Sequence, residues 1–317
     1  MIEVDVLTGR HRPISSMGLV EPLLRNRELF RDAGINIRRV YSRPDRTRGS
    51  DVLILDSKVL KAQWGSNPDI ALNTISDLRS RTNKLCFFDS ADSTGSVQTQ
   101  VIPFVDLYLK AQVLRDKTQY EKTLYGERVY TDYFFRHLGI RDSDEIFSHA
   151  LSSSEIKKIR PAWNVGLAGG YGKRINPLWR VFPLLICGIH MDRRNFYNAP
   201  GGSREIDLLT RMTINQTRET VAYQRNHALN ILASYAPKVG AVSKSTYLAE
   251  MRRSKVVLAP FAWGEMNMRD FECFALGGLL AKPSMSHMTT FPNYYIENQT
   301  YIPVDWALTD LAQKIDF

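Results

Sequence analysis

The segment from Ser254 to Gly278, SKVVLAPFAWGEMNMRDFECFALGG, decides the fold of the C-terminal half. Its apolar run at 256–260 predicts a buried strand, and the residues at 270–276 have the apolar spacing of a helix that ends at Gly277 and Gly278. A strand that runs through a loop into a helix aims the free N–H groups of the first helical turn at the strand's carboxyl end. This arrangement predicts a diphosphate-binding site.

Strands and helices alternate on both sides of this segment. Strands are predicted at 2–7, 35–41, 51–55, 84–88, 105–109, 163–168, 206–210 and 279–282, and helices at 21–33, 70–81, 219–234, 247–253 and 309–315. Strands separated by helices form parallel βαβ units, and ligands of such sheets bind beyond the carboxyl ends of the strands. The chain is therefore expected to be an α/β protein with its sites at those ends.

The chain length predicts two domains. At 317 residues the chain exceeds the usual size of a single hydrophobic core. The serines at 152–154 and the basic stretch at 157–161 interrupt any regular period, which is typical of a linker. The expected domains are residues 1–155 and 156–317.

Composition excludes several classes of protein. Hydrophobic residues make up 44% and charged residues 24%, which is ordinary globular usage and unlike disorder. No run approaches eighteen apolar residues and the N-terminus lacks a secretion signal, so a cytoplasmic location is expected. The three cysteines Cys86, Cys187 and Cys273 lie in apolar runs and predict buried thiols, and the histidines show no ligand spacing. We expect no structural metal and no cofactor.

The net charge of +9 is unevenly distributed. Between Arg10 and Arg48 there are ten arginines and four acidic residues. This stretch is either a solvated basic face or a surface for a phosphate-bearing partner, such as a nucleotide, a lipid diphosphate or an anionic membrane surface. Nucleic acid is not expected, since no recognition motif accompanies the charge.

The helix at 270–276 carries a motif. Arg269, Phe271, Glu272, Ala275 and Gly277 form the pattern Arg-x-Phe-Glu-x-x-Ala-x-Gly after a strand and a loop. The pattern resembles the donor domain of group 1 and exostosin-like glycosyltransferases. The resemblance implies that Glu272 accepts hydrogen bonds from the donor ribose hydroxyls and that Arg269 faces the diphosphate or the sugar. A carboxylate can hold two vicinal hydroxyls and an arginine can fork onto phosphate oxygens. The alternative is an ion pair between Arg269 and Glu272 on the helix surface.

The same resemblance extends to the preceding loop, with one departure. Trp263, Gly264, Glu265 and Met268 fall at donor-site positions. Many retaining members of the family carry two glutamates with seven residues between them, whereas Glu265 and Glu272 have six. The departure speaks against a retaining mechanism based on Glu265 and leaves a loop-holding role open.

Two further groups are candidates for contact with the donor phosphates. The first is the glycine-rich loop after the strand expected at 163–168, which contributes Gly169, Gly170, Lys173 and Arg174. An ordinary strand-to-helix turn would also need glycine there. The second group follows the strand expected at 206–210 and comprises Arg211, Arg218 and Arg225. Arg218 and Arg225 lie seven positions apart on one helical face, for which a solvated basic face is the alternative to a phosphate clamp.

Three residues of the first domain are candidates for the catalytic base. Asp89 and Asp92 follow a strongly apolar strand, and His11 follows the first strand. Transfer of a sugar to a hydroxyl requires a group that removes the hydroxyl proton. The alternative for the two aspartates is turn capping, which the Asp-Ser-Ala-Asp sequence also suits.

The resemblance and the strand pattern together predict two Rossmann-like domains that face one another across a cleft, the GT-B architecture. The N-terminal domain would bind a glycan or lipid-linked acceptor, and the C-terminal domain a nucleotide-sugar co-substrate, without protein-bound metal and within polysaccharide biosynthesis. Peripheral contact with a membrane surface stays open. The alternatives are a sugar-nucleotide epimerase on the same fold and a non-catalytic nucleotide-sugar-binding or membrane-surface module.

Overall fold

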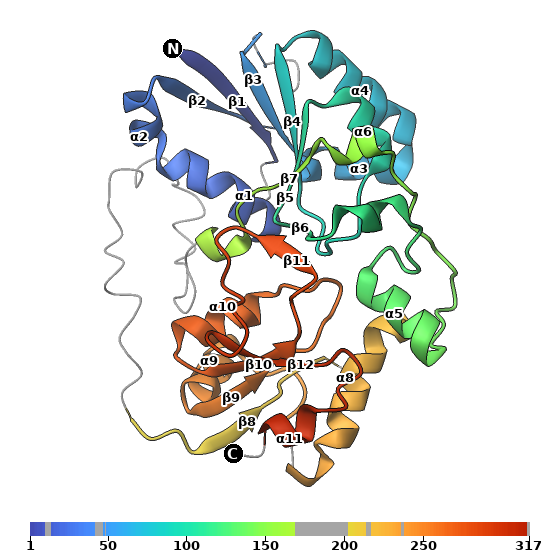
Figure 1. Ribbon diagram of the computed structural model, residues 1–317. Helices are drawn as coiled ribbons and strands as arrows, with labels where there is room; N and C mark the ends of the chain where they lie inside the picture. The colour runs from blue at the N-terminus through green and yellow to red at the C-terminus, as the bar shows by residue number, and fades with distance from the viewer. Residues whose placement is uncertain are drawn as a thin grey trace. The chain divides into compact units, whose positions relative to one another are not determined.

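The computed structural model describes residues 1–9, 14–41, 47, 49–168, 202–213, 217–235 and 238–315. The chain divides into two compact units, each with a parallel β-sheet of its own (Figure 1). Unit 1 comprises Met1–Glu127, Phe147–Ala168 and His287–Asn293, and unit 2 comprises Arg128–Ile146, Gly169–Ser286 and Tyr294–Phe317. The predicted α/β class with two Rossmann-like units is confirmed.

Unit 1 is built on six parallel strands in the order β2-β1-β3-β4-β5-β7. The strands are β1 (Ile2–Thr8), β2 (Ile35–Tyr41), β3 (Val52–Asp56), β4 (Lys84–Asp89), β5 (Leu107–Lys110) and β7 (Ile159–Pro161). The strand order reverses next to β1, so the carboxyl ends of β1 and β3 form the switch point where ligands of doubly wound sheets bind.

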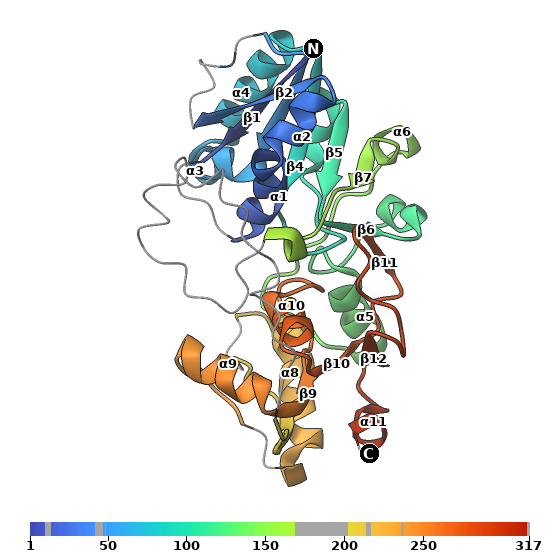
Figure 2. The ribbon, with the colours of Figure 1, turned by 90° about the vertical axis from the view of Figure 1, so that its left-hand side faces the viewer.

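Helices cover both faces of this sheet, with α1 (Ile14–Arg25) and α2 (Arg27–Asp32) on one side and α3 (Lys61–Ser66) and α4 (Pro68–Ser80) on the other (Figures 1 and 2). In α4 the Asn67 side chain accepts a hydrogen bond from the Asp69 N–H at 3.0 Å, and proline occupies the first position of the helix. Ala71, Ile75 and Leu78 form its buried stripe. The remaining elements of unit 1 are α6 (Ser153–Ile156), the 3-10 turns η2 (Ser57–Leu60), η3 (Thr99–Phe104), η4 (Lys117–Glu121) and η5 (Val165–Ala168), and an antiparallel pair, β6 (Gln112–Leu114) with β11 (Met288–Thr290).

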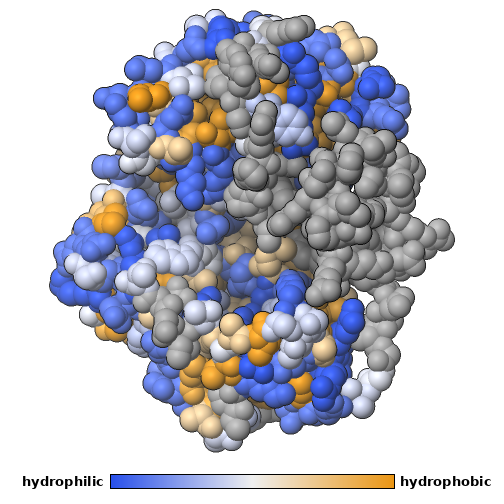
Figure 3. Space-filling model, turned by 180° about the vertical axis from the view of Figure 1, so that it is seen from behind, coloured by the Kyte–Doolittle hydropathy of each residue, from blue (hydrophilic) through white to orange (hydrophobic). Residues whose placement is uncertain are grey.

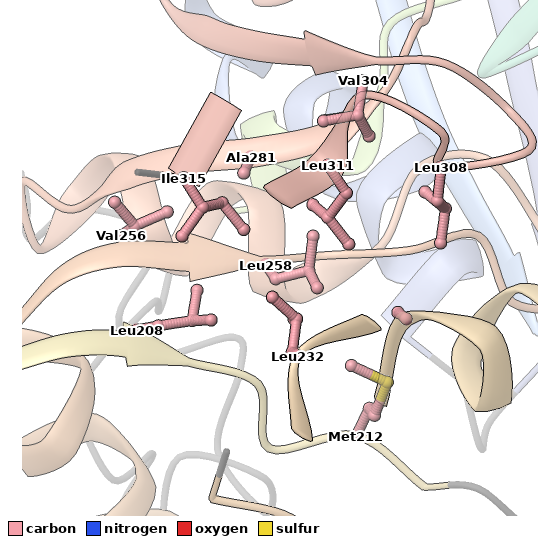
Figure 4. Close-up of a cluster of buried hydrophobic side chains, with 11 residues drawn as sticks. Leu208, Met212, Leu232, Val256, Leu258, Ala281, Val304, Leu308, Leu311 and Ile315 are labelled. Carbon is pink, nitrogen blue, oxygen red and sulfur yellow. The ribbon is translucent and has the colours of Figure 1, made fainter. Parts of the chain in front are cut away.

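Unit 2 is built on four parallel strands in the order β12-β10-β9-β8. The strands are β8 (Ile206–Leu209), β9 (Ser254–Leu258), β10 (Leu279–Pro283) and β12 (Tyr301–Val304), and the helices are α5 (Val129–Leu138), α8 (Glu219–Ile231), α9 (Lys244–Arg252), α10 (Met268–Ala275) and α11 (Leu311–Ile315), with the 3-10 turn η7 (Ala233–Tyr235). Figure 4 shows the core on one face, where Leu208, Val256 and Leu258 of the strands pack with Leu232 and Leu311. Complete burial of one such leucine contributes about 1.5–3 kcal/mol.

The segment that decides the fold has the predicted form: β9, a loop, α10 and β10. The Asn267 N–H donates to Asp270 Oδ2 at 3.2 Å at the start of α10. Gly277 has a φ of 67°, the left-handed conformation that ends helices. A Cβ at Gly278 would lie 3.0 Å from Cys273 Sγ and 3.2 Å from Val257 Cγ2. Gly277 is therefore favoured by its positive φ, and Gly278 by the lack of space for a Cβ.

The predicted linker is part of unit 1. The Ser152 N–H donates to Glu155 Oε2 at 2.8 Å in a capping box at the start of α6, and residues 159–161 pair with β5 as strand β7. Serines that cap a helix and serines of a linker look alike in sequence. The structure does not divide the chain once at 155: residues 128–146 already belong to unit 2, the first unit continues to residue 168, and residues 287–293 belong to unit 1 again.

The strand predicted at 163–168 is also wrong. Trp163 forms a single bridge with Phe291, and the residues from Val165 to Ala168 form a 3-10 turn. The indole Nε1 of Trp163 donates to the carbonyl of Leu19 at 2.9 Å, so this segment packs within unit 1. The first strand of unit 2 that the structure describes is β8.

On the face drawn in Figure 3, hydrophobic residues are interspersed with hydrophilic ones. None of the described helices has the length and apolarity needed to cross a bilayer. Cys86 and Cys273 are buried free thiols as predicted, and burial raises the pKa of Cys86 to about 11 and that of Cys273 to about 12. Cys187 lies outside the described residues.

Candidate functional site

Arg269, in the first turn of α10, reaches the carboxyl ends of two strands. Its Nη1 donates to the carbonyl of Leu258 at 3.1 Å and to that of Thr210 at 3.3 Å, and its Nη2 donates to the carbonyl of Arg211. These carbonyls end or follow β9 and β8, so the guanidinium joins α10 to both strands. The predicted motif residue thus lies at the edge of the sheet where ligands of parallel sheets bind.

Arg225 of α8 adds a second guanidinium to this edge. Its Nη1 donates to the carbonyl of Thr213 at 2.8 Å and its Nε to that of Phe261 at 3.3 Å. Burial, and next the positive charge of Arg269, lower the pKa of Arg225. Neither guanidinium forms an ion pair with a carboxylate of the described residues. Two like charges in partial burial favour an anion between or beside them.

Glu272 follows on the same helix, and its side chain is buried. Its Oε1 forms an ion pair with Lys244 Nζ of α9, and that ammonium lies 4.9 Å from the centre of the Tyr247 ring. Glu272 therefore pairs with Lys244 and not with Arg269, contrary to the helix-surface alternative. The partner Lys244 is itself 62% exposed.

Tyr247, also on α9, lies beside both motif residues. Burial is the main cause that raises the pKa of its hydroxyl; next, the positive charge of Arg269 lowers this pKa and the negative charge of Glu272 raises it. Tyr247 therefore connects the positive and the negative group of the site. The sequence analysis missed Lys244 and Tyr247, because α9 shows only a short helical pattern with no motif.

A buried ion pair holds the start of α10 against the sheet. Lys282 of β10 and Asp270 of α10 are both fully buried, with Nζ 3.2 Å from Oδ2. Lys282 Nζ also donates to the Ala259 carbonyl at 3.1 Å, and the Tyr295 hydroxyl donates to Asp270 Oδ2 at 2.7 Å. Burial lowers the pKa of Lys282, while the negative charges of Asp270 and Glu265 oppose the shift. The pair fixes the turn that carries Arg269.

The loop before α10 contains the other predicted donor residues. Trp263 is 36% exposed, and the Arg128 guanidinium lies 5.2 Å from the centre of its ring while Arg128 Nε donates to its carbonyl at 2.8 Å. The Gly264 carbonyl accepts from the Ala262 N–H at 3.2 Å. Glu265 is fully buried near Lys282, which supports the loop-holding role. Met268 is the first residue of α10.

Arg211 was a candidate for contact with the donor phosphates, but its side chain pairs with the carboxylate of Glu250. Its Nε and Nη2 each donate to Glu250 at 2.7 Å, and this bidentate pair raises the pKa of Arg211 and lowers that of Glu250. Arg211 is thus an ion-pair residue that joins the end of β8 to α9. Arg218 directly precedes α8 and is half-buried. The remaining candidates, Gly169, Gly170, Lys173, Arg174 and His11, lie outside the described residues.

In unit 1 the two aspartates differ. Asp89 is 1% exposed, its Oδ1 accepts from the Ala91 N–H at 2.8 Å, and its Oδ2 accepts from Lys110 Nζ at 2.7 Å and the Tyr108 hydroxyl at 2.8 Å. These contacts are those of a turn cap and a buried ion pair. Asp92 is exposed, and its carbonyl accepts from Gln112 Nε2 at 2.5 Å. Of the two, Asp92 has the accessible carboxylate.

Asp56 lies at the switch point of unit 1 and was not predicted. It is 1% exposed and accepts from the Thr8 hydroxyl at 3.0 Å, from the Ser16 hydroxyl and from the Lys58 N–H at 3.0 Å. It directly follows the strand predicted at 51–55, so its position at a strand end was the available signal. Over the described part of the chain, no three His, Cys, Asp or Glu side chains converge as metal ligands.

Comparisons with known proteins concern the architecture alone. No protein-family model matches the chain, and no curated protein sequence matches it. An alpha-glucosyltransferase solved in complex with UDP and a 13-mer DNA containing a HMU base has a TM-score of 0.46 and 9% identity, over 99% of this chain and 89% of that chain. A UDP-GlcNAc 2-epimerase from Methanocaldococcus jannaschii has a TM-score of 0.36 and 11% identity, over 100% of this chain and 92% of that chain. At these values the likeness carries no substrate, acceptor or residue role over to this chain.

Proposed function

We propose that the chain is a glycosyltransferase that transfers a sugar from a nucleotide-sugar donor held by unit 2. The observation that supports the proposal is the set of charges at the carboxyl edge of the unit 2 sheet. Arg225 and Arg269 bring two guanidiniums without a described carboxylate partner, and the buried carboxylate of Glu272 lies one helical turn away. A diphosphate next to a ribose diol has the complementary pattern of charge and hydrogen bonds.

In this proposal the donor diphosphate lies against Arg225, Arg269 and the N-terminal turn of α10. Glu272 accepts hydrogen bonds from the ribose hydroxyls, which requires Lys244 to release Oε1 or to share it. The Lys244 side chain is largely exposed and flexible, so its displacement costs little. Tyr247, beside both motif residues, orients them.

The chemistry follows from the same charges. The acceptor oxygen forms a bond to the anomeric carbon and its proton passes to a base, while the bond between the anomeric carbon and the diphosphate oxygen breaks and negative charge develops on the leaving diphosphate. Guanidiniums and helix N–H groups already aimed at that position stabilise the charge without a metal ion. Transfer should therefore persist in excess EDTA, and activity that chelation abolishes and magnesium restores would contradict the assignment.

The acceptor hydroxyl needs a base in the proposed mechanism. Asp92 and His11 remain candidates, whereas the contacts of Asp89 favour a structural role. We propose a glycan or a lipid-linked acceptor, and the net charge of +9 suits one that bears phosphate. A DNA acceptor, which the sequence disfavours, carries the same kind of charge and belongs in the assay.

The decisive experiment is a thermal-shift screen of the full chain with UDP-, GDP-, dTDP- and CMP-sugars, since a ligand raises stability by RT ln(1 + [L]/Kd). The selected donor is then incubated with and without acceptors. Transfer to an acceptor supports the proposal, and isomerisation of the donor without acceptor identifies an epimerase. Binding without either reaction identifies a non-catalytic module, and no stabilisation by any nucleotide sugar removes the proposal.

A further inference from the structure

The basic segment 157–161, expected to be a linker, leads into the edge strand β7 of unit 1, where Arg160 lies close to a further lysine, Lys117. Lys117 Nζ donates to the carbonyl of Ile159 at 2.9 Å, and Arg160 Nη1 donates to the same carbonyl, also at 2.9 Å. The distance between Lys117 Nζ and Arg160 Nη1 therefore cannot exceed the sum of these two distances. Two cations thus share one acceptor oxygen.

The charges of this pair are not neutralised by the described residues. Neither Lys117 nor Arg160 forms an ion pair with a carboxylate there, and burial followed by the charge of Arg160 lowers the pKa of Lys117. The carboxylate of the neighbouring Asp116 accepts hydrogen bonds from Thr118 and Gln119. The repulsion between the two cations is therefore largely unbalanced in the free protein.

The neighbouring lysines do not share this geometry. Lys158 Nζ donates to the Ile102 carbonyl at 2.9 Å, so it is engaged elsewhere. Lys157 is exposed at the end of α6. Arg160 is exposed and Lys117 half-buried, so the pair is accessible from the side of Arg160.

We propose that Lys117 and Arg160 form a binding site for a phosphate group at the β7 edge of unit 1. A phosphate offers oxygens that accept from a guanidinium and an ammonium together, and its charge removes the repulsion between the two cations. The binding does not depend on the transfer reaction.

The test is an NMR titration of the full chain with inorganic pyrophosphate, followed at the Arg160 Nε–Hε signal, which is assigned by its loss in Arg160→Lys. This local signal separates the site from phosphate binding in unit 2. Vesicles that contain phosphatidic acid form a second arm, which distinguishes a lipid phosphate from a soluble one. The variants are Lys117→Met and Arg160→Gln, with Lys157→Met as the matched loss of a nearby positive charge.

A saturable shift is expected, with affinity weakened at least about tenfold in Lys117→Met, as for loss of one charged hydrogen bond, and less than about twofold in Lys157→Met. In Arg160→Gln, the NMR signal of the Lys117 ammonium should no longer shift when pyrophosphate is added. In Arg160→Lys, part of this shift should remain. If Lys117→Met fails to fold, the Arg160 variants decide. The absence of a saturable shift with both pyrophosphate and vesicles, or equal losses of affinity in Lys157→Met and the site variants, would overturn the proposal. A response to vesicles alone assigns the phosphate to a lipid, and a response to pyrophosphate to a soluble molecule.

Discussion

The Asp89 carboxylate and the Lys110 ammonium are 2.7 Å apart, and each side chain is 1% exposed. Lys282 and Asp270 repeat this relationship in unit 2, and in each unit a tyrosine hydroxyl donates to the carboxylate that pairs with the lysine. In both units the lysine lies near the carboxyl end of a sheet strand. A buried ion pair of this kind locks the polar loops at the edge of the sheet, because removal of one partner leaves the other charged and unpaired.

This relationship predicts different stabilities for two aspartate variants of one loop. Asp89→Asn leaves Lys110 without its counter-charge, so it should lower the free energy of unfolding by about 3–5 kcal/mol. Asp92→Asn changes an exposed side chain and should stay within about 0.5 kcal/mol. Urea unfolding of both variants measures the difference, and equal stabilities would contradict the buried pair.

Asp92 has a separate catalytic prediction. If its exposed carboxylate is the base, Asp92→Asn should cut turnover by about 10²- to 10⁴-fold while leaving donor affinity nearly unchanged. His11→Ala is the comparison, since His11 follows the first strand and is the other candidate. Steady-state kinetics and calorimetry on the same samples separate the two residues. Full turnover in both variants would remove both from the mechanism.

The pair between Arg211 and Glu250 predicts a pH-dependent stability. Because the pKa of Glu250 is lowered in the folded protein, chiefly by hydrogen bonds from Arg211, its contribution is complete above the ordinary value of 4.5. The contribution is lost as the pH falls through the lower folded value. Arg211→Met should therefore cost about 1.5–3 kcal/mol at neutral pH and little in strong acid.

Unfolding curves of Arg211→Met across that pH range check the prediction. Arg252→Met, at the exposed end of the same helix α9, is the control and should follow the wild type throughout. A constant difference between Arg211→Met and wild type at all pH values would show that the loss arises from packing and not from the charge of Glu250.

How far the sequence determined these features depends on the distance between partners. The strand, loop and helix around Arg269 were predictable, because an apolar run, helical spacing and two glycines lie within 25 consecutive residues. The partners Asp89 and Lys110 lie 21 positions apart, and the strands β6 and β11 pair residues such as Leu114 and Met288. No local period records such long-range contacts. The prediction of a single domain boundary was wrong for the same reason. Residues 287–293 belong to unit 1 through contacts with residues that are distant in the sequence.

Glu272 is the proposed acceptor of hydrogen bonds from the donor ribose. Glu272→Ala should weaken binding of the selected nucleotide sugar by about 1–3 kcal/mol, the cost of losing a charged hydrogen-bond partner. Lys244→Met should act in the opposite direction, because it frees Oε1 from its present ion pair. Calorimetry measures both affinities, with Glu219→Ala in the exposed first turn of α8 as the control. An unchanged affinity in Glu272→Ala would show that the ribose lies elsewhere.

Arg225 is the proposed partner of the donor diphosphate, and it lies outside the motif at 269–277. Its guanidinium is held by two carbonyls, and burial, followed by the positive charge of Arg269, lowers its pKa, so a bound diphosphate would relieve the repulsion between the two guanidiniums. Arg225→Met should weaken binding of the nucleoside diphosphate chosen by the screen by about 1.5–3 kcal/mol. The parent nucleoside, which has no phosphate, should bind as before.

Salt dependence and two companion variants complete this test. The affinity of the wild type for the nucleoside diphosphate should fall as ionic strength rises, and Arg225→Met should reduce that dependence, since one of the two screened charges is gone. Arg225→Lys keeps the charge but loses the planar fork, so its affinity should lie between those of wild type and Arg225→Met. Arg252→Met removes an exposed positive charge from α9 and should bind as the wild type does. If Arg225→Met weakens the binding of the nucleoside and of the nucleoside diphosphate equally, the role of Arg225 is to support the fold of the loop at Phe261. The anion would then bind at Arg269 alone.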